Sequence, residues 1–368
     1  MSIPLVRAIC RRVAMAALAT PVLLLGAGGP AHPGGAGLEW SQSGRSLAFW
    51  CDSGLYSVNM VQGGVVRLTS VPARGRCSPD GMRVAWSDRD ATYVYHAGST
   101  GDIRIAEPGR VAGWSPDSKW VLVESCPPRQ APEIYAASAD GKGASPLAPH
   151  PAWDGNATCS PDGRWIAFVS QRDAQRSDIW VVGWDGSQLS RVTAMFEANA
   201  PAWSPDGSRL AFCGRATASS PRQVYWLDFR TRKLTAVTPE ARGDVRDPRF
   251  VGPDYLTYVG GTPEMADLRS GARRELPRGE LSPDGRMAAV LSGRPGSLDV
   301  IPLAGGDRRP VDKGVEACAW SPDGHWLAYL ALSPGPTGGV VRELRVSALD
   351  STGVYVLWSE GLPSRGGA

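Results

Sequence analysis

The chain has 368 residues, of which 42% are hydrophobic, 20% charged and 8% aromatic. This composition is typical of a globular protein, and the 44 glycines and 31 prolines favour a fold rich in turns over one built on long helices. The formal net charge is +3, and three positive charges, Arg7, Arg11 and Arg12, lie in the first 36 residues, which contain no acidic residue. The remainder is neutral and lacks the basic field that nucleic-acid binding requires, which excludes nucleic acid as a leading partner.

The first segment has the features of an export signal. Its arginines precede an apolar run over residues 13–26, and small residues follow that run. These parts predict a secretory signal cleaved after Ala27 or Ala31, with residues 1–36 forming the signal peptide and a short linker. The run is shorter than the ~20 residues that span a bilayer, so we expect a periplasmic or secreted protein with no membrane span after cleavage. An arginine pair leaves Sec and twin-arginine export both open.

Seven cysteines are present, one of which, Cys10, lies in the predicted signal. The other six form no Cys-x-x-Cys pair and no Cys/His cluster with the spacing of a zinc site. An oxidising compartment permits disulfides among them, but their spacing does not indicate a pairing. Cys77 and Cys159 stand where other repeats, described next, have tryptophan, which indicates a place in the core.

A four-residue turn motif recurs along the rest of the chain. Ser-Pro-Asp-Gly occurs five times, and three looser copies bring the number of repeats to eight. The motifs begin at Ser41, Ser78, Ser115, Ser160, Ser204, Gly252, Ser282 and Ser321. Proline presets the backbone for a turn, aspartate bonds to its own backbone and glycine accepts a positive φ, so each motif predicts a tight turn between two strands. The mean interval is about 40 residues, which is the length of a four-stranded propeller blade.

The residues around each motif repeat as well. An apolar–small–aromatic strand such as Leu47-Ala48-Phe49 follows the motif, and its alanine leaves room for a neighbouring sheet. Tryptophan precedes the motif in four repeats, at Trp40, Trp114, Trp203 and Trp320. A second tryptophan column follows the motif serine by five residues, at Trp120, Trp165 and Trp326. We expect both columns to pack between blades.

Each unit continues with two more strands joined by Asp-Gly or Gly-Gly, a combination that indicates a tight hairpin, as in residues 178–193. We therefore predict an all-β fold with almost no helix. It is a β-propeller of four-stranded antiparallel blades over residues 37–368, with eight blades and with seven as the alternative.

The pattern Trp-Ser-Pro-Asp-Gly-x-x-Leu-Ala-Phe, present in full at residues 203–212, resembles the WD-like propeller repeat of the TolB family. The namesake of that family is the periplasmic component of the Tol–Pal envelope system, and similar repeats occur in prolyl oligopeptidase-type enzymes. TolB carries an α/β domain before six blades, whereas here the repeats begin at Leu38, directly after the predicted signal. The resemblance therefore implies a TolB-like propeller that lacks the TolB α/β domain, and not TolB itself.

Motifs that carry chemistry are missing from the sequence. There is no Gly-x-Ser-x-Gly elbow of the hydrolase kind, and the scattered histidines His32, His96, His150 and His325 indicate no nucleophile–base pair. The repeated motif aspartates are what such turns require, and the Asp-x-Asp-x-Asp run of a calcium loop does not occur. We therefore predict no enzymatic activity, no catalytic residue, no cofactor and no metal site.

Variable loops are the expected place for function in a repeat protein. The loops between second and third strands share one face with the connections between blades, and they carry charges of both signs. A protein-binding surface and an ordinary solvated loop face both fit that mixture. The candidate partner-binding residues are Arg172, Asp173, Arg176, Arg215, Asp244 and Asp247.

The sequence favours a non-catalytic, exported, TolB-like scaffold of the cell envelope, monomeric, that binds an envelope or secreted protein. One alternative is a propeller enzyme or ligand sensor that acts on a carbohydrate or lactone in the central channel. The channel-mouth positions before the motifs include Arg110, Asn199, Asp247 and Glu316, which offer no repeated ligand set. Another alternative is a partner domain for a separately encoded enzyme or transporter.

Overall fold

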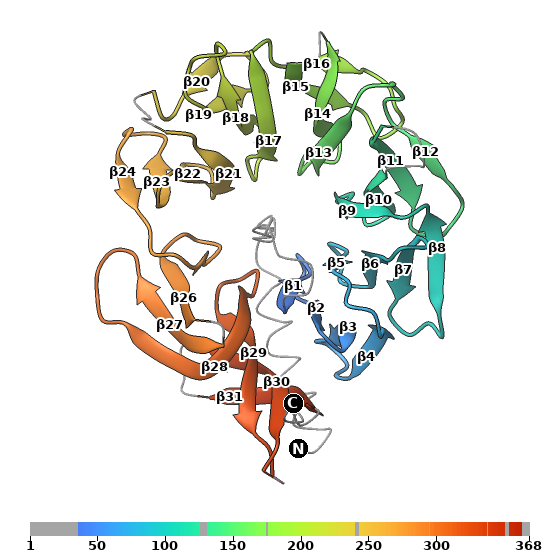
Figure 1. The fold of residues 1–368 in the computed structure, drawn as a ribbon, viewed down its shortest axis with the longest axis vertical. Coiled ribbons are helices and arrows are strands. Elements are labelled where there is room, and N and C mark those ends of the chain that lie inside the picture. The colour runs from blue at the N-terminus through green and yellow to red at the C-terminus, as the bar shows by residue number, and fades with distance from the viewer. Residues whose placement is uncertain are drawn as a thin grey trace, which may run out of the picture. The chain divides into compact units, whose positions relative to one another are not determined.

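The structure of the protein is a computed structural model. It describes residues 36–125, 131–173, 176–239, 243–293, 295–336, 338–349 and 353–362. Within these ranges the secondary structure consists of strands and turns, with no helix (Figure 1), so the predicted all-β class is confirmed. The same ranges contain no helix of the length and hydropathy needed to cross a membrane. Residues 1–35 of the predicted signal segment 1–36, with Cys10, and residue Cys126 lie outside the described residues.

The chain divides into two compact units. Unit 1 takes in the residues up to Val84, His96–Ser99 and those from Pro277 onward, and it holds the first and the last sheet. The first sheet contains β1 (Gly37–Trp40), β2 (Ser46–Cys51), β3 (Gly54–Asn59) and β4 (Val65–Thr69). The last contains β25 (Glu280–Leu281), β26 (Met287–Gly293), β27 (Gly296–Pro302), β28 (Arg309–Trp320), β29 (Trp326–Pro334), β30 (Val340–Ala348) and β31 (Val354–Gly361).

Unit 2 takes in Ala85–Tyr95 and Thr100–Leu276, with four complete four-stranded antiparallel sheets. The first two contain β9 (Gly109–Trp114), β10 (Trp120–Ser125), β11 (Glu133–Ser138), β12 (Ala144–Pro146), β13 (Asp154–Cys159), β14 (Ile166–Asp173), β15 (Arg176–Val182) and β16 (Ser190–Arg191). The next two contain β17 (Glu197–Trp203), β18 (Arg209–Arg215), β19 (Gln223–Asp228), β20 (Leu234–Ala236), β21 (Arg246–Val251), β22 (Tyr255–Val259), β23 (Pro263–Asp267) and β24 (Arg273–Glu275). A further sheet, divided between the units, contains β5 (Gly75–Cys77), β6 (Arg83–Ser87), β7 (Thr92–His96) and β8 (Asp102–Ala106).

The last sheet differs from the predicted pattern because β28 serves two repeats. Its first half pairs with β27, where Val315 lies opposite Gly296, and its second half pairs with β29, where Trp320 lies opposite Leu327. The register shifts within β28 next to Gly314, whose φ is +69°, and the chain continues as one long strand. The last two repeats therefore form one seven-stranded sheet, and the number of blades stays a prediction.

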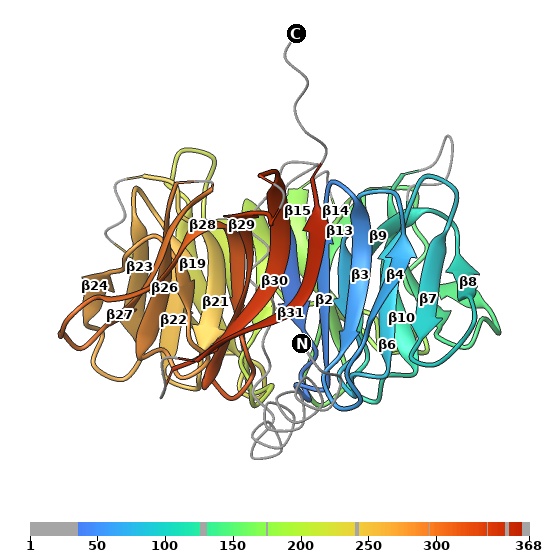
Figure 2. The same cartoon turned by 90° about the horizontal axis from the view of Figure 1, so that it is seen from below.

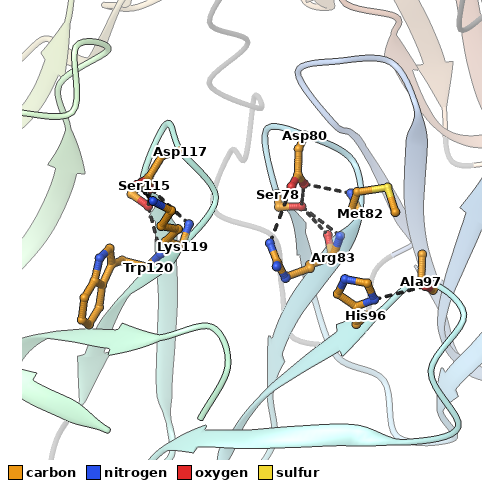
Figure 3. Close-up of polar contacts among 10 residues, drawn as sticks. All are labelled: Ser78, Asp80, Met82, Arg83, His96, Ala97, Ser115, Asp117, Lys119 and Trp120. Atoms are coloured by element: carbon orange, nitrogen blue, oxygen red, sulfur yellow. Dashed lines mark hydrogen bonds and ion pairs between the residues drawn. The ribbon is translucent and has the colours of Figure 1, made fainter. Parts of the chain in front are cut away.

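The Ser-Pro-Asp-Gly turn is held by its own side chains, as the turn at Ser78 shows (Figure 3). The Ser78 hydroxyl donates to Asp80 Oδ1 at 2.6 Å and accepts the amide of Arg83 at 2.9 Å. Asp80 Oδ1 also accepts the amide of Met82 at 2.9 Å. Gly81 takes a φ of +73°, where a Cβ is disfavoured, and its amide donates to the Ser78 carbonyl. The motif thus closes the turn between the first and second strands of its repeat.

The looser copy at Ser115 keeps the same hydrogen bonds. Ser115 donates to Asp117 at 2.6 Å and accepts the amide of Trp120 at 2.9 Å, while Asp117 accepts the amide of Lys119. Ser118 stands in place of glycine and takes a φ of +61°. The turn geometry therefore depends on the serine and the aspartate, and it tolerates a non-glycine residue at its fourth position.

The predicted core column before the motif is confirmed, since Trp40, Trp114, Trp203 and Trp320 are buried. Most members of this column donate to the carbonyl two residues before the motif of the preceding repeat. The bonds run from Trp203 Nε1 to Thr158 (3.4 Å), from Trp320 Nε1 to Glu280 (2.9 Å), from Trp40 Nε1 to Ala319 (3.3 Å) and from Cys77 Sγ to Glu39 (3.4 Å). Cys77 thus takes the tryptophan's place in the bonding as well as in the sequence.

The second tryptophan column is only partly buried. Trp120 is 39% exposed, so its expected packing is wrong. Trp165 packs against Phe229 and Trp326 against Tyr355, with ring centroids 5.8 Å and 6.2 Å apart. Since the covering ring comes from another part of the chain, position in the repeat alone does not decide burial in this column.

Candidate functional site

The six candidate residues lie in unit 2, at the ends of strands β14, β15, β18 and β21 and in the connection before β21. The structure joins Asp173, Arg176, Arg215 and Asp244 through a chain of contacts. It buries Arg172 and places Asp247 in a strand bulge.

Arg172 is a core residue of its sheet, and its expected exposure is wrong. Its side chain is only 8% exposed, and its guanidinium donates to Asp154 Oδ2 at 2.7 Å and to the carbonyl of Ala148 at 3.0 Å. The rings of Phe168 and Trp180 lie 5.4 Å and 5.0 Å from its charge. Burial raises the pKa of Asp154, and hydrogen bonds to the carboxylate oppose that rise. The pair stabilises the end of the sheet and offers little to a partner.

Asp173 is half exposed and ends β14, directly opposite Arg176 across the hairpin. It pairs with Arg191 at 2.8 Å, and Arg191 also binds Asp178 at 2.6 Å. Asp178 is fully buried, and it accepts further hydrogen bonds from Thr193 Oγ1 and from the amide of Met195. Arg191 therefore connects an exposed carboxylate to a buried one, which fixes the position of both.

Arg176 is exposed and begins β15. Its guanidinium lies over the ring of Phe196, 5.3 Å from the centroid, an arrangement favoured by the ring quadrupole. The amide of Phe196 donates to the carbonyl of Arg215 at 3.0 Å, so this aromatic residue links the hairpin of one sheet to the next sheet.

Arg215 and Arg222 flank the loop between β18 and β19 and share two carboxylates. Arg215 binds Asp244 Oδ2 at 2.6 Å and Glu197 Oε2 at 3.2 Å, and Arg222 binds Glu197 through its guanidinium. The amide of Arg222 donates to Asp244 Oδ1 at 3.1 Å. That amide, and the nearby guanidinium of Arg215, hold the pKa of Asp244 below its usual value. We call the connected set of Asp173, Arg176, Phe196, Arg215 and Asp244 the loop surface.

Asp247 occupies a β-bulge instead of a loop. It takes a φ of +54° and lies in the register shift between Arg246 and Arg249. Its carboxylate lies 3.9 Å from the guanidinium of its neighbour Arg246. Asn156 and Ala200 occupy the same bulge in β13 and β17, with φ values of +52° and +53°. Asp247 thus belongs to a recurring feature of the first strands and not to the loop surface.

Sequence reasoning missed Glu197, Arg191, Asp178 and Phe196, which hold the loop surface together. One spacing pattern in the sequence could have predicted part of this network of ion pairs. In two consecutive repeats an acidic residue stands six or seven positions before the motif serine and an arginine eleven or twelve after it, namely Asp154 with Arg172 and Glu197 with Arg215. The two members face each other across the first two strands, so this spacing predicts an ion pair.

The described residues hold no group of three or more His, Cys, Asp or Glu side chains placed to bind a metal ion. His96 Nδ1 lies 3.2 Å from the carbonyl of Ala97, and His325 lies 3.7 Å from Asp323 in its own turn. Beside the loop surface, burial raises the pKa of the Cys213 thiol to about 12, which keeps it protonated at neutral pH.

Comparison with known proteins shows what part of the chain is similar to. Residues 76–242 match the family described as the TolB beta propeller domain. This part of the chain is TolB-like. The predicted TolB-like resemblance and the predicted propeller fold are thereby confirmed.

Among curated proteins, an uncharacterized protein of Agrobacterium fabrum is 35% identical over 144 residues, which is 37% of this chain. The match spans about half the length of that relative, 48%. Among solved structures, a eukaryotic initiation factor has a TM-score of 0.54 at 15% identity, over 90% of this chain and 89% of its own.

A puromycin-hydrolyzing peptidase of Mycobacterium tuberculosis has a TM-score of 0.53 at 15% identity, over 77% of this chain and 52% of its own. TolB of Acinetobacter baumannii matches at 18% identity over 81% of both chains, with a TM-score of 0.42. At such low identities a structural likeness concerns the fold alone, and propellers of this fold serve proteins of different function.

Proposed function

We propose that the protein is a non-catalytic, exported scaffold of the cell envelope that binds a protein partner through the loop surface. The observation that carries the proposal is the exposed Arg176 on Phe196, next to the ion-paired Arg215 and Asp244. Arginine and aromatic side chains are enriched in protein interfaces, where they supply most of the binding free energy. The TolB-type propeller and the apolar N-terminal run behind its arginines support an envelope location.

The charges of the loop surface suit recognition better than catalysis. Each of its carboxylates contacts an arginine, as Asp173 does Arg191 and Asp244 does Arg215, so none is left to act as a free acid or base. Arg176 differs, because its contact in the described residues is an aromatic ring. It is therefore the cation of the loop surface that we expect to pair with a carboxylate of the partner.

The test begins with capture of a partner from an envelope extract on the immobilised protein and its identification by mass spectrometry. The association rate of the purified partner is then measured for the wild type and for Arg176→Glu. We expect the charge reversal to slow association about tenfold and to leave the melting temperature within about 1 °C, because a single surface charge contributes little to stability. Raising the salt concentration slows association of the wild type, since exposed charges are screened.

Arg164→Glu is the matched control. Arg164 is an exposed arginine at the opposite end of β14, in the Ser-Pro-Asp-Gly turn, where it lies 3.8 Å from Asp162. Loss of binding in this variant, with normal binding of Arg176→Glu, would place the interface on the turns. Turnover of an oligosaccharide or a lactone by the purified protein would refute the non-catalytic function.

A further inference from the structure

The first and last sheets of unit 1 lie against each other although they are about 300 residues apart in the chain. A single apolar cluster contains Leu47, Phe49 and Val58 of the first sheet together with Leu330 and Leu344 of the last. Among the described residues these two sheets share no paired strand, because each keeps its own contiguous strand order. Their junction is therefore made by side chains.

Strand β31 supplies the aromatic part of this junction. Trp358 packs on Phe49 and Tyr56, with its ring centroid 4.9 Å from each, and the latter two rings stack at 4.8 Å. Such aromatic contacts add about 0.5–1.5 kcal/mol each to the burial of apolar area. Trp358 thus fastens the outermost strand of the last sheet to the middle of the first.

The polar part converges on the turn between β2 and β3. Ser53 Oγ donates to Glu360 Oε2 of β31 at 2.5 Å, and it also lies 3.0 Å from the Tyr56 hydroxyl. Next to it, Asp52 accepts a bond of 3.4 Å from Arg342 of β30. Strands β30 and β31 therefore each send one charged side chain to the same two-residue turn.

Arg342 is held firmly on its own side of the junction. Its side chain is 4% exposed, and Glu316 of β28 accepts two of its hydrogen bonds, at 2.6 Å and 3.2 Å. The partner across the junction, Asp52, is by contrast 74% exposed. The junction thus combines a rigid donor on the last sheet with a turn of the first sheet that water can reach.

Strand β31 is an edge strand of the last sheet. It is the outermost strand, it pairs with β30 alone, and its residues are exposed or partly exposed throughout (Figure 2). Outer strands with few buried contacts open at lower free energy than central strands such as β29, which is buried over most of its length.

We propose that β31 is a releasable strand that keeps the first and last repeats together, and that it detaches more easily than the central strands of the last sheet. Trp358 and Glu360 leave with the strand, and Phe49, Tyr56 and Ser53 become exposed. Arg342 stays with β30 and Glu316. Detachment of β31 leaves every strand pairing of the first sheet intact, because none of them involves β31.

Hydrogen–deuterium exchange of the full chain tests this proposal. In the wild type, amides of β31 exchange faster than those of β29. Ser53→Ala and Glu360→Ala each remove the same hydrogen bond from opposite sides, and each accelerates exchange in β31 and in the turn at Asp52 about tenfold, which corresponds to about 1.4 kcal/mol. Exchange in β14 and β18 of unit 2 is unchanged. The double variant exchanges no faster than the Ser53→Ala single variant, which already lacks the bond to Glu360 as well as the contact with Tyr56.

Ser359→Ala is the control on the same strand, since Ser359 is exposed and neighbours Glu360. The proposal is overturned if Ser53→Ala matches this control, if β31 exchanges as slowly as β29, or if the variants accelerate exchange equally in all sheets. The last outcome would mean that the junction opens only when the whole chain unfolds.

Discussion

Removal of one buried hydroxyl tests whether the turn motif stabilises its repeat. In the motif between β17 and β18, Ser204 is 1% exposed, donates to Asp206 Oδ1 at 2.6 Å and accepts the amide of Arg209 at 2.9 Å. Ser204→Ala deletes the oxygen that bonds both groups. Asp206 keeps a bond of 3.1 Å from the amide of Ser208 and one of 2.8 Å from its hydroxyl, so the principal loss falls on the Arg209 amide.

The expected cost follows from that single unpaired amide. A buried donor left without an acceptor costs about 1–3 kcal/mol, whereas a replaced surface residue costs less than about 0.5 kcal/mol. We therefore expect Ser204→Ala to lower the free energy of unfolding by about 2 kcal/mol. For a unit of this size that corresponds to a fall of about 4–8 °C in melting temperature.

Thermal unfolding followed by circular dichroism measures the effect, with Ser208→Ala as the matched control. Ser208 is an exposed serine of the same turn and also donates to Asp206. If the two variants lose the same stability, the buried hydroxyl is not what holds the turn, and the explanation of the motif is wrong.

Three further predictions concern a buried alanine, two buried cysteines and the aspartate of the same turn. Ala211→Leu should lower the free energy of unfolding by about 1–3 kcal/mol in a urea titration, because Ala211 is fully buried and the added volume has no space; an unchanged midpoint would contradict close packing. Cys77 and Cys213 should resist thiol labelling at pH 8 until denaturant is added, because burial raises the pKa of both to about 12; rapid native labelling would contradict their burial. Burial raises the pKa of Asp206, but hydrogen bonds from Ser204 and Ser208 outweigh this effect, so the net pKa is lowered. The ionised Asp206 carboxylate therefore stabilises the folded state fully above about pH 4, and this stabilisation is lost as the pH falls further. Urea midpoints at pH 7 and pH 3 should therefore differ less for Ser204→Ala than for the wild type, and equal differences would contradict this coupling.

The repeat pattern predicted the fold class because its determinants are local. The bonds by which Ser78 and Asp80 close their turn join residues no more than five positions apart, so the motif carries its own closing contacts. The core position of Trp203 followed from the same periodicity, since a residue at a fixed distance before a turn faces the same neighbour in each repeat. Both features can be predicted from residue types and their spacing alone.

The candidate site was predicted less well, since its side chains act over longer distances in the chain. From the sequence, Arg172 is expected to be an exposed loop cation. In the structure it pairs inside the sheet with Asp154, which lies 18 residues earlier in the chain. Arg215 meets Asp244 across 29 residues, and Ser53 meets Glu360 across 307. Spacing within one repeat cannot place such partners, because they lie on different strands whose relative position is set by packing.

The sequence by itself thus determined the strands, the turns between them and the column of buried tryptophans, because each depends on contacts within one repeat or between one repeat and the next. Only the tertiary structure decided which charged residues are exposed, that β28 joins two repeats into one sheet, and that β31 fastens the last repeat to the first. The physical reason is that an ion pair or an aromatic contact requires two side chains at a definite distance, and for residues far apart in the chain that distance is fixed by the packing of the sheets.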